Sequence, residues 1–325
     1  MAKGKRLPSW SDETGWTRVF KALPDPVRPT SPMSVQEEWR RLEGFDVHLD
    51  RWLAPGARAK IVMLHGGGGH GRLLGALAWR LALHGFETIC PDLPGYGVTR
   101  GRAKSSIRYD DWREVAAGLM AEERARGGAL FVYGLSMGGM LAYDAVVMTG
   151  KADGLIASCF LDPTRKNVRR SIVRQPWMAG LIDPLFALTP RLFNGLPIPM
   201  ALTGNMRAIS NSAAVTEAIV ADRLAGGNSM PTGFLRTWLQ APPLAPPESF
   251  DACPVLMVHP AADRWTDVSV SDDFFSRLAV QKRRVMLENC GHFPIQAPGS
   301  DQHDHAIAEF IGAIVERRPM REVLV

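Results

Sequence analysis

Cysteine is scarce in this chain. The 325 residues include only four cysteines, and no two of them have the spacing of metal ligands. They are Cys90, Cys159, Cys253 and Cys290. We therefore expect buried free thiols in a cytoplasmic protein, with neither a disulfide framework nor a metal site.

Long apolar runs and a strong charge bias are also missing. The sequence contains no stretch of about 18 uncharged apolar residues, and its basic N-terminus lacks the apolar segment of a secretory signal. We expect a soluble protein without stable membrane insertion. The formal net charge is +5, and the basic residues are scattered without interleaved aromatic side chains. The charge pattern therefore predicts no nucleic-acid partner.

The rhythm of apolar residues divides the chain into three kinds of segment. Residues 1–40 contain five prolines and few periodic apolar positions, which predicts an irregular N-terminal arm. Short apolar strands alternate with amphipathic helices over residues 41–162, and this alternation returns over residues 248–325. Residues 163–247 are rich in Trp, Met, Leu and Pro instead. We predict an α/β protein with a mostly parallel, doubly wound sheet and an inserted helical cap at 163–247.

The motif GLSMGG at residues 134–139 stands between an apolar strand and a helix-compatible segment. In this context the pattern G-x-S-x-G holds a serine on a tight turn and exposes its hydroxyl above the sheet. An isolated motif of this kind would describe a helix cap equally well, so the flanking strand and helix decide the interpretation. They predict Ser136 as a nucleophile.

A serine hydroxyl needs an imidazole base, and the base needs a carboxylate that fixes its tautomer. Asp263 follows the strand PVLMVHP and His292 follows the next strand, so the order along the chain is serine, acid, histidine. Asp162, after an earlier strand, is the rival acid. Among the other histidines, His303 and His305 lie in a polar stretch where we expect surface groups. His84 is expected at a helix C-terminus.

The glycine run HGGGGHG at residues 65–71 supports two interpretations. With Asp92 about twenty residues later, it imitates the fingerprint of a dinucleotide-binding oxidoreductase. Alternatively, a loop of small residues lets backbone N–H groups reach a developing oxyanion. Because the serine, aspartate and histidine are present elsewhere, we favour an oxyanion hole formed by the N–H groups of Met137 and of Gly67 or Gly66. No cofactor is then needed. His65 and His70 lack a third ligand nearby, so we expect packed or loop-bonding histidines and no metal.

At these motifs the sequence resembles the α/β-hydrolase superfamily, especially its esterase, monoacylglycerol-lipase-like and serine-aminopeptidase-like branch. The resemblance spans residues 41–162 and 248–318 and rests on HGGGG, PDLPGYG, GLSMGG, HPAADRWT and GHFP. It implies a sheet of about eight strands, a helical cap over the site, no cofactor and a reaction through an acyl-enzyme.

The substrate is the least determined feature. Apolar residues of the cap that are not needed for packing would line an acyl pocket, which favours a small, largely apolar ester together with water. An amide, thioester or lactone fits the same three residues. A homo-oligomer stays possible on the sequence alone.

Overall fold

The computed structural model describes residues 7–29, 35–173, 175–181, 184, 188 and 190–316. Its centre is an eight-stranded sheet with the order β1-β2-β4-β3-β5-β6-β9-β10. Only β2 runs against its neighbours, since it pairs antiparallel with both β1 and β4. The other pairings are parallel. The strands are β1 (Val35–Leu42), β2 (Phe45–Trp52), β3 (Ala59–Leu64), β4 (Phe86–Pro91), β5 (Leu130–Gly134), β6 (Gly154–Ala157), β9 (Val255–Pro260) and β10 (Lys282–Leu287).

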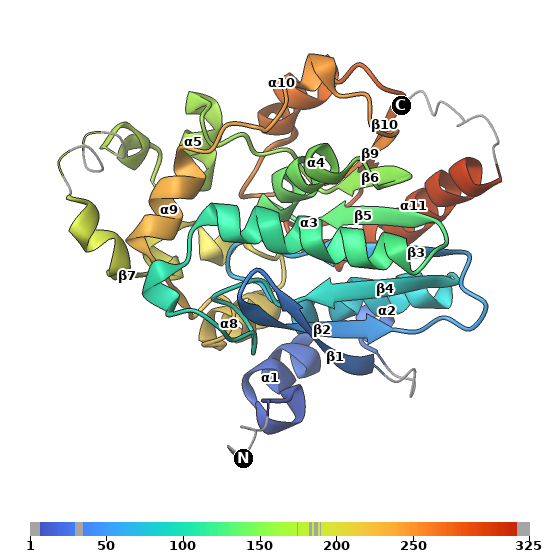
Figure 1. Ribbon diagram of the computed structural model, residues 1–325, viewed down its shortest axis with the longest axis horizontal. Coiled ribbons are helices and arrows are strands. Elements are labelled where there is room, and N and C mark those ends of the chain that lie inside the picture. The colour runs from blue at the N-terminus through green and yellow to red at the C-terminus, as the bar shows by residue number, and fades with distance from the viewer. Residues whose placement is uncertain are drawn as a thin grey trace.

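Helices cover both faces of this sheet, as a doubly wound fold requires. Figure 1 shows α3 (Tyr109–Ala125) and α4 (Met137–Thr149) on one face, and α2 (Gly75–Leu83) and α11 (Gly299–Val315) on the other. The final crossover helix is α10 (Val268–Arg277). The central strands β3, β5 and β9 are buried almost throughout because helices cover both of their faces. The predicted α/β architecture with about eight strands is confirmed.

The segment between β6 and β9 leaves the sheet and gathers at one side of the molecule (Figure 1). It is mostly helical within its described residues and contains one small two-stranded sheet. Its elements are α5 (Lys166–Ile172), β7 (Pro197–Pro199), α7 (Met200–Thr203), α8 (Ala213–Ala221), β8 (Ser229–Pro231) and α9 (Thr232–Leu239). We refer to residues 163–247 as the inserted segment.

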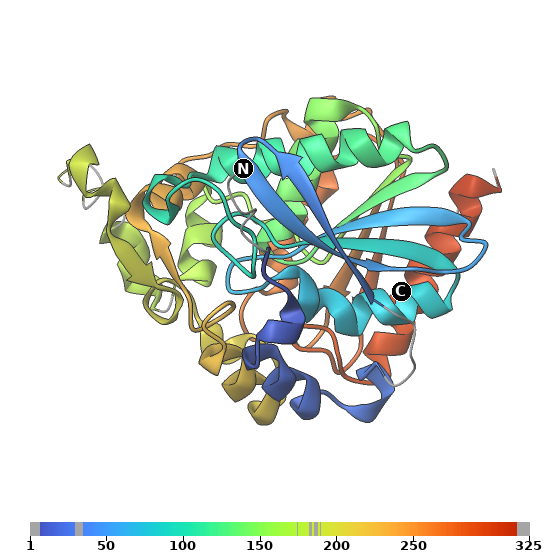
Figure 2. The same ribbon diagram turned by 60° about the horizontal axis from the view of Figure 1, so that its bottom comes forward.

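The expectation of an irregular N-terminal arm is wrong for the described residues. Helix α1 (Gly15–Ala22) buries Val19 and lies against α8, and Figure 2 shows the two helices side by side. Strand β1 begins at Val35, inside the predicted arm, and pairs with β2 along its whole length. The prolines between these elements dominated the local pattern. The charged residues of β1 also made this strand hard to predict. Charge is common on an edge strand because it discourages pairing with other chains.

His303 is also placed differently from the expectation. Helix α11 begins at Gly299, so the polar stretch around His303 is part of the helix, and His303 is fully buried on its inner side. Its Nδ1 hydrogen-bonds to Asp304 (2.9 Å). His305 is exposed and His84 ends α2, as expected.

The four cysteines are buried free thiols. Within the part of the chain that the structure describes, no helix is long and apolar enough to cross a bilayer.

Candidate active site

Ser136 lies on the tight turn between β5 and α4. Its backbone has φ 58° and ψ −124°, a conformation that non-glycine residues rarely adopt and that persists only when the surroundings impose it. The N–H of Ser136 donates to Ser158 Oγ, just beyond β6, at 2.8 Å. The turn is thus fixed from the neighbouring strand, and the serine side chain remains partly exposed.

The glycines of GLSMGG are required by close packing. A Cβ atom on Gly134 would collide with the backbone of Gly138, and one on Gly138 would collide with the carbonyl group of Leu64 at the end of β3. The first turn of α4 can therefore approach β3 only because these positions carry no side chain. This approach brings the N-terminus of α4 next to the loop that follows β3.

Asp263 and His292 meet at the carboxyl ends of β9 and β10. His292 Nδ1 lies 2.8 Å from Asp263 Oδ2, so Nδ1 carries the hydrogen and donates it. Burial alone would raise the pKa of the Asp263 carboxyl, but the adjacent imidazole of His292 and hydrogen bonds from His292, Thr266 and Trp265 lower it to about 2. Asp263 is therefore an anion that holds one tautomer of His292.

The other nitrogen of His292 is free to accept a proton. Nε2 is buried and has no hydrogen-bond partner among the described residues. His292 is 3% exposed, and it lines the same cavity as Ser136. In such sites the hydrogen bond between base and nucleophile commonly tightens only when substrate binds. The structure thus brings Ser136, Asp263 and His292 to one end of the sheet.

Asp162 takes part in a different set of polar contacts from Asp263. Its carboxylate accepts from the N–H (2.9 Å) and the hydroxyl (2.5 Å) of Thr164 and pairs with Arg165 (3.5 Å). It makes no contact with His292 in the described part of the chain. The geometry therefore favours Asp263 over this rival acid.

The candidate oxyanion donors also lie at Ser136. Met137 is the first residue of α4, where an N–H has no acceptor within the helix. A Cβ atom on Gly66 would lie 2.8 Å from Leu135 O and 3.2 Å from Met137 N. Gly67 lines the cavity beside Ser136. The glycine run thus passes directly over the turn of Ser136.

Residues 65–71 form the glycine loop. The hydrogen bonds of two buried histidines hold this loop in place. His65 Nδ1 donates to Gly66 O (2.8 Å), and its Nε2 accepts from the N–H of Leu93 (3.0 Å). Burial lowers the pKa of His65 to about 4, so its imidazole is neutral. His70 lies at the far end of the loop, where Nδ1 accepts from Leu73 N–H (3.0 Å). In the described residues no group of three or more His, Cys, Asp or Glu side chains could hold a metal ion.

Asp92 is not available to a dinucleotide. Its carboxylate is fully buried and accepts from the N–H groups of Gly71 (2.7 Å) and Val98 (3.0 Å). Although burial favours the neutral form, His48 and these hydrogen bonds lower the pKa of Asp92 to about 2. The residue that imitated a ribose ligand instead fixes the glycine loop to the sheet.

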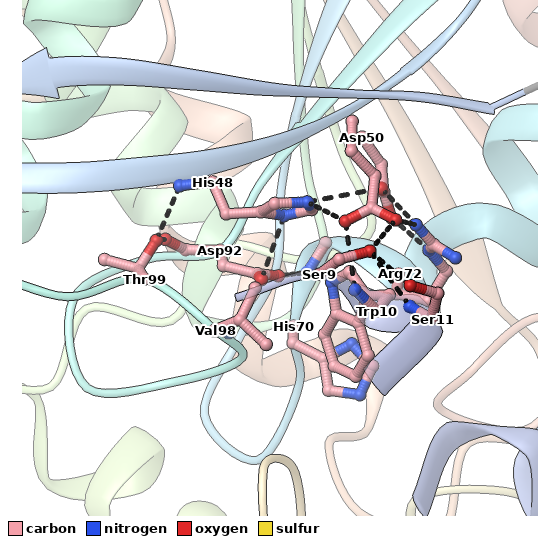
Figure 3. A network of polar contacts seen from close by, with 12 residues as sticks. Ser9, Trp10, Ser11, His48, Asp50, His70, Arg72, Asp92, Val98 and Thr99 are labelled. Carbon is pink, nitrogen blue, oxygen red and sulfur yellow. Dashed lines mark hydrogen bonds and ion pairs between the residues drawn. The ribbon is translucent and has the colours of Figure 1, made fainter. Parts of the chain in front are cut away.

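A buried polar network extends from Asp92 to the edge strands (Figure 3). His48 on β2 lies between Asp92 Oδ2 (3.2 Å) and Glu37 Oε2 (3.0 Å). Burial alone would lower the pKa of His48, but the two carboxylates raise it to about 9. Nearby, Arg72 forms an ion pair with Asp50 (2.6 Å). Sequence reasoning missed this network because its members are far apart along the chain.

Sequence reasoning also missed Thr266. Its hydroxyl donates to Asp263 Oδ2 (2.8 Å), and its N–H donates to Asp263 Oδ1 (3.0 Å). The spacing Asp-x-x-Thr after a strand is the available signal, since Asp side chains commonly accept from backbone groups two or three residues later.

The pocket above Ser136 is apolar. It is lined by side chains from the loops that follow the strands and from the inserted segment. Its lining includes Tyr96, Leu161, Ile172, Met200, Phe234, Leu235, Trp238 and Trp265. Among the described residues no charged side chain is part of this lining, so the pocket suits a neutral, apolar group.

Comparisons with known proteins agree with this architecture. Residues 55–296 match the family model described as serine aminopeptidase, S33. A soluble variant of monoglyceride lipase from Saccharomyces cerevisiae, solved with a substrate analogue, aligns with a TM-score of 0.69 at 19% identity, covering 88% of this chain and 98% of that one. A monoacylglycerol lipase from Paleococcus ferrophilus gives 0.61 at 19% identity, with 83% and 99% covered. A thermostable carboxyl esterase from Bacillus coagulans gives 0.61 at 16% identity, with 87% and 99% covered. No curated protein sequence matches the chain.

Proposed function

Because the chain belongs to the serine aminopeptidase S33 family of α/β-hydrolases, we propose that it is a serine esterase. Its substrate would be a small, largely apolar carboxylic ester, hydrolysed through an acyl-enzyme intermediate. The observation that carries this proposal is the Asp263–His292 pair with its free Nε2 in the cavity of Ser136.

The first half of the reaction forms the acyl-enzyme. Ser136 Oγ attacks the ester carbonyl carbon while His292 Nε2 takes the hydroxyl proton. Negative charge develops on the carbonyl oxygen, where the N–H groups of Met137 and of Gly67 or Gly66 would receive it. The tetrahedral intermediate collapses when His292 returns the proton to the leaving alcohol. Asp263 stabilises the imidazolium that forms in between.

The second half repeats this chemistry with water. His292 Nε2 takes a proton from a water molecule, and the resulting hydroxide equivalent attacks the acyl carbon. Collapse of the second intermediate gives the proton back to Ser136 and releases the carboxylic acid. Every group that the reaction needs is supplied by the chain and water, so the proposal includes no cofactor.

The apolar pocket supports an ester more than a peptide with a free amino terminus. A substrate ammonium group would need a carboxylate or a cluster of carbonyl oxygens, and no acidic side chain lines the pocket in the part of the chain that the structure describes. Thioesters and lactones present an equally neutral acyl group, so they are alternative substrates for the same three residues.

A fluorophosphonate probe tests the nucleophile. We expect covalent labelling of Ser136, located by peptide mapping, and none in Ser136→Ala with an unchanged melting curve. Labelling of another residue, or none in folded wild-type protein, would overturn the assignment.

Matched substrates test the reaction class. A series of p-nitrophenyl esters with apolar acyl groups should be hydrolysed much faster than p-nitroanilides of the same acids. Faster cleavage of the anilides would move the protein to the amidases and leave Ser136 in place.

A further inference from the structure

The N-terminal segment reaches the end of the glycine loop through Trp10. This side chain is 1% exposed although it lies near the start of the chain. Its ring stacks on His70 with 4.4 Å between ring centroids and 37° between planes. Figure 3 shows the two rings lying side by side below the His48 network.

Hydrogen bonds fix Trp10 to the edge of the sheet. Glu37 on β1 accepts from the N–H of Trp10 (3.0 Å) through one oxygen and from the hydroxyl of Ser9 (2.9 Å) through the other. Glu37 carries a negative charge. Burial alone would raise its pKa, but His48 and these hydrogen bonds lower it to about 2. These hydrogen bonds therefore fix the backbone of Trp10 where its indole ring contacts His70.

His70 connects the glycine loop to the inserted segment. Because its Nδ1 accepts from Leu73 N–H, the hydrogen is on Nε2, which donates to Asp222 Oδ2 at 3.2 Å. Asp222 ends helix α8 of the inserted segment. The imidazole of His70 thus bonds to Leu73 through Nδ1 and to the inserted segment through Nε2, and its ring contacts Trp10.

The N-terminal segment also approaches Asp222 directly, at the start of α1. A Cβ atom on Gly15, the first residue of α1, would lie 2.8 Å from Asp222 Oδ1. Only glycine lets α1 approach the end of α8 this closely. The N-terminal segment, the glycine loop and the inserted segment therefore meet around His70.

We propose that Trp10 is a positioning residue for the reaction and that it acts through His70. By holding the imidazole against Asp222, Trp10 fixes the end of the glycine loop whose N–H groups stabilise the oxyanion. This inference rests on the proposed function. Oxyanion donors work only within a few tenths of an ångström of their correct place, so a small shift of the loop slows the chemical step more than it weakens substrate binding.

A role in stability alone would look different. Trp10 buries a large ring, so Trp10→Ala will lower the melting temperature in either case. A merely structural Trp10 would leave kcat unchanged well below that temperature. Trp16, which is partly exposed, provides the control, because it lies edge-on to Phe20 and contacts Arg72 as Trp10 does, but forms no ring contact with His70 among the described residues.

The experiment measures kcat and KM on one p-nitrophenyl ester for Trp10→Ala, Trp10→Phe, Trp16→Ala, His70→Ala and the double variant Trp10→Ala/His70→Ala. For Trp10→Ala we expect kcat to fall about ten- to a hundredfold with KM changed less than about threefold. Trp10→Phe should recover most of the loss, and Trp16→Ala should show none. The double variant should match His70→Ala, because both changes break one connection.

Unchanged kcat in Trp10→Ala, or losses that multiply in the double variant, would overturn the proposal. If Trp10→Ala does not fold, Trp10→Leu tests the same point, because it keeps a large apolar side chain but removes the aromatic ring that contacts His70; unchanged kcat there has the same meaning. Fluorophosphonate labelling of wild-type Ser136 is measured first. Failure of that labelling would reject the serine-hydrolase proposal itself, whereas a normal label with unchanged variants would reject only the role of Trp10.

Discussion

The Asp263–His292 pair and the Asp92–His48 pair combine the same two side chains, but they differ at the second nitrogen of the imidazole. His292 binds Asp263 through Nδ1, and its Nε2 has no partner among the described residues. His48 lies between Asp92 and a second carboxylate, Glu37. The first histidine can exchange a proton with a substrate. The second is a fixed cation inside a structural network.

This difference shows that an aspartate–histidine contact does not by itself mark a catalytic site. What distinguishes the two pairs is the surroundings of the far nitrogen: a cavity shared with Ser136 in one case and an acidic side chain in the other. The two pairs are nevertheless connected, since Asp92 holds Gly71 and so fixes the loop that passes over Ser136.

Replacing Asp263 should have the largest effect on activity. In Asp263→Asn we expect kcat to fall roughly a thousandfold or more, because the imidazole loses its orientation and the stabilisation of its charge. Asp162→Asn is the control and should stay near the wild type. Steady-state kinetics with matched circular dichroism and melting curves check both. Collapse in Asp162→Asn together with normal hydrolysis by Asp263→Asn would move the acid to the earlier strand.

Replacing Asp92 should lower stability strongly and should reduce activity less than replacing Asp263 does. In Asp92→Asn the cation of His48 loses one carboxylate, so the free energy of unfolding should fall by about 3 kcal/mol. Activity of the folded protein should fall by no more than about a hundredfold, because Asp92 fixes the loop without touching the reacting atoms. Denaturant unfolding and kcat at 25 °C measure the two effects. A thousandfold loss of kcat at normal stability would place Asp92 in the catalytic machinery.

The charge of His48 predicts how stability changes with pH. The pKa of His48 is about 9 in the folded protein and near 6.5 when unfolded, so the folded state binds this proton more tightly. Its contribution to stability is complete below about pH 6.5 and is lost as the pH rises through 9. The melting temperature should drop by about 5 °C over this range. His48→Gln should be less stable at pH 6 and show a smaller drop; an equal drop would contradict the assignment.

The smallest effect concerns Thr266. Thr266→Val removes the hydroxyl that donates to Asp263 Oδ2 but keeps the two backbone N–H donors on Oδ1. A hydrogen bond to a charged group contributes about 1.5–3 kcal/mol to stability, and only part of this is expected to act on the transition state, so kcat should fall about fivefold. Thr164→Val makes the same change beside Asp162 and should leave kcat unaltered. Equal effects of the two variants would remove Thr266 from the support of Asp263.

The sequence by itself determined the features that depend on neighbouring residues. Alternating apolar strands and helices are local patterns, and they predicted the doubly wound sheet, which the structure confirms. The strand, the glycines and the helix around Ser136 lie within about 20 residues, so the motif predicted its tight turn. The order of Asp263 and His292 after consecutive strands predicted that their side chains would lie near each other, as they do.

Only the tertiary structure decided which polar groups bind one another. Asp92 looked like a ribose ligand because its partner His48 is 44 positions away on another strand. The burial of His303 depends on where α11 begins against the sheet, and the contact of Trp10 with His70 joins segments that share no local pattern. Burial and hydrogen bonding between distant segments set the charge of an ionisable group, and no short stretch of sequence contains both partners.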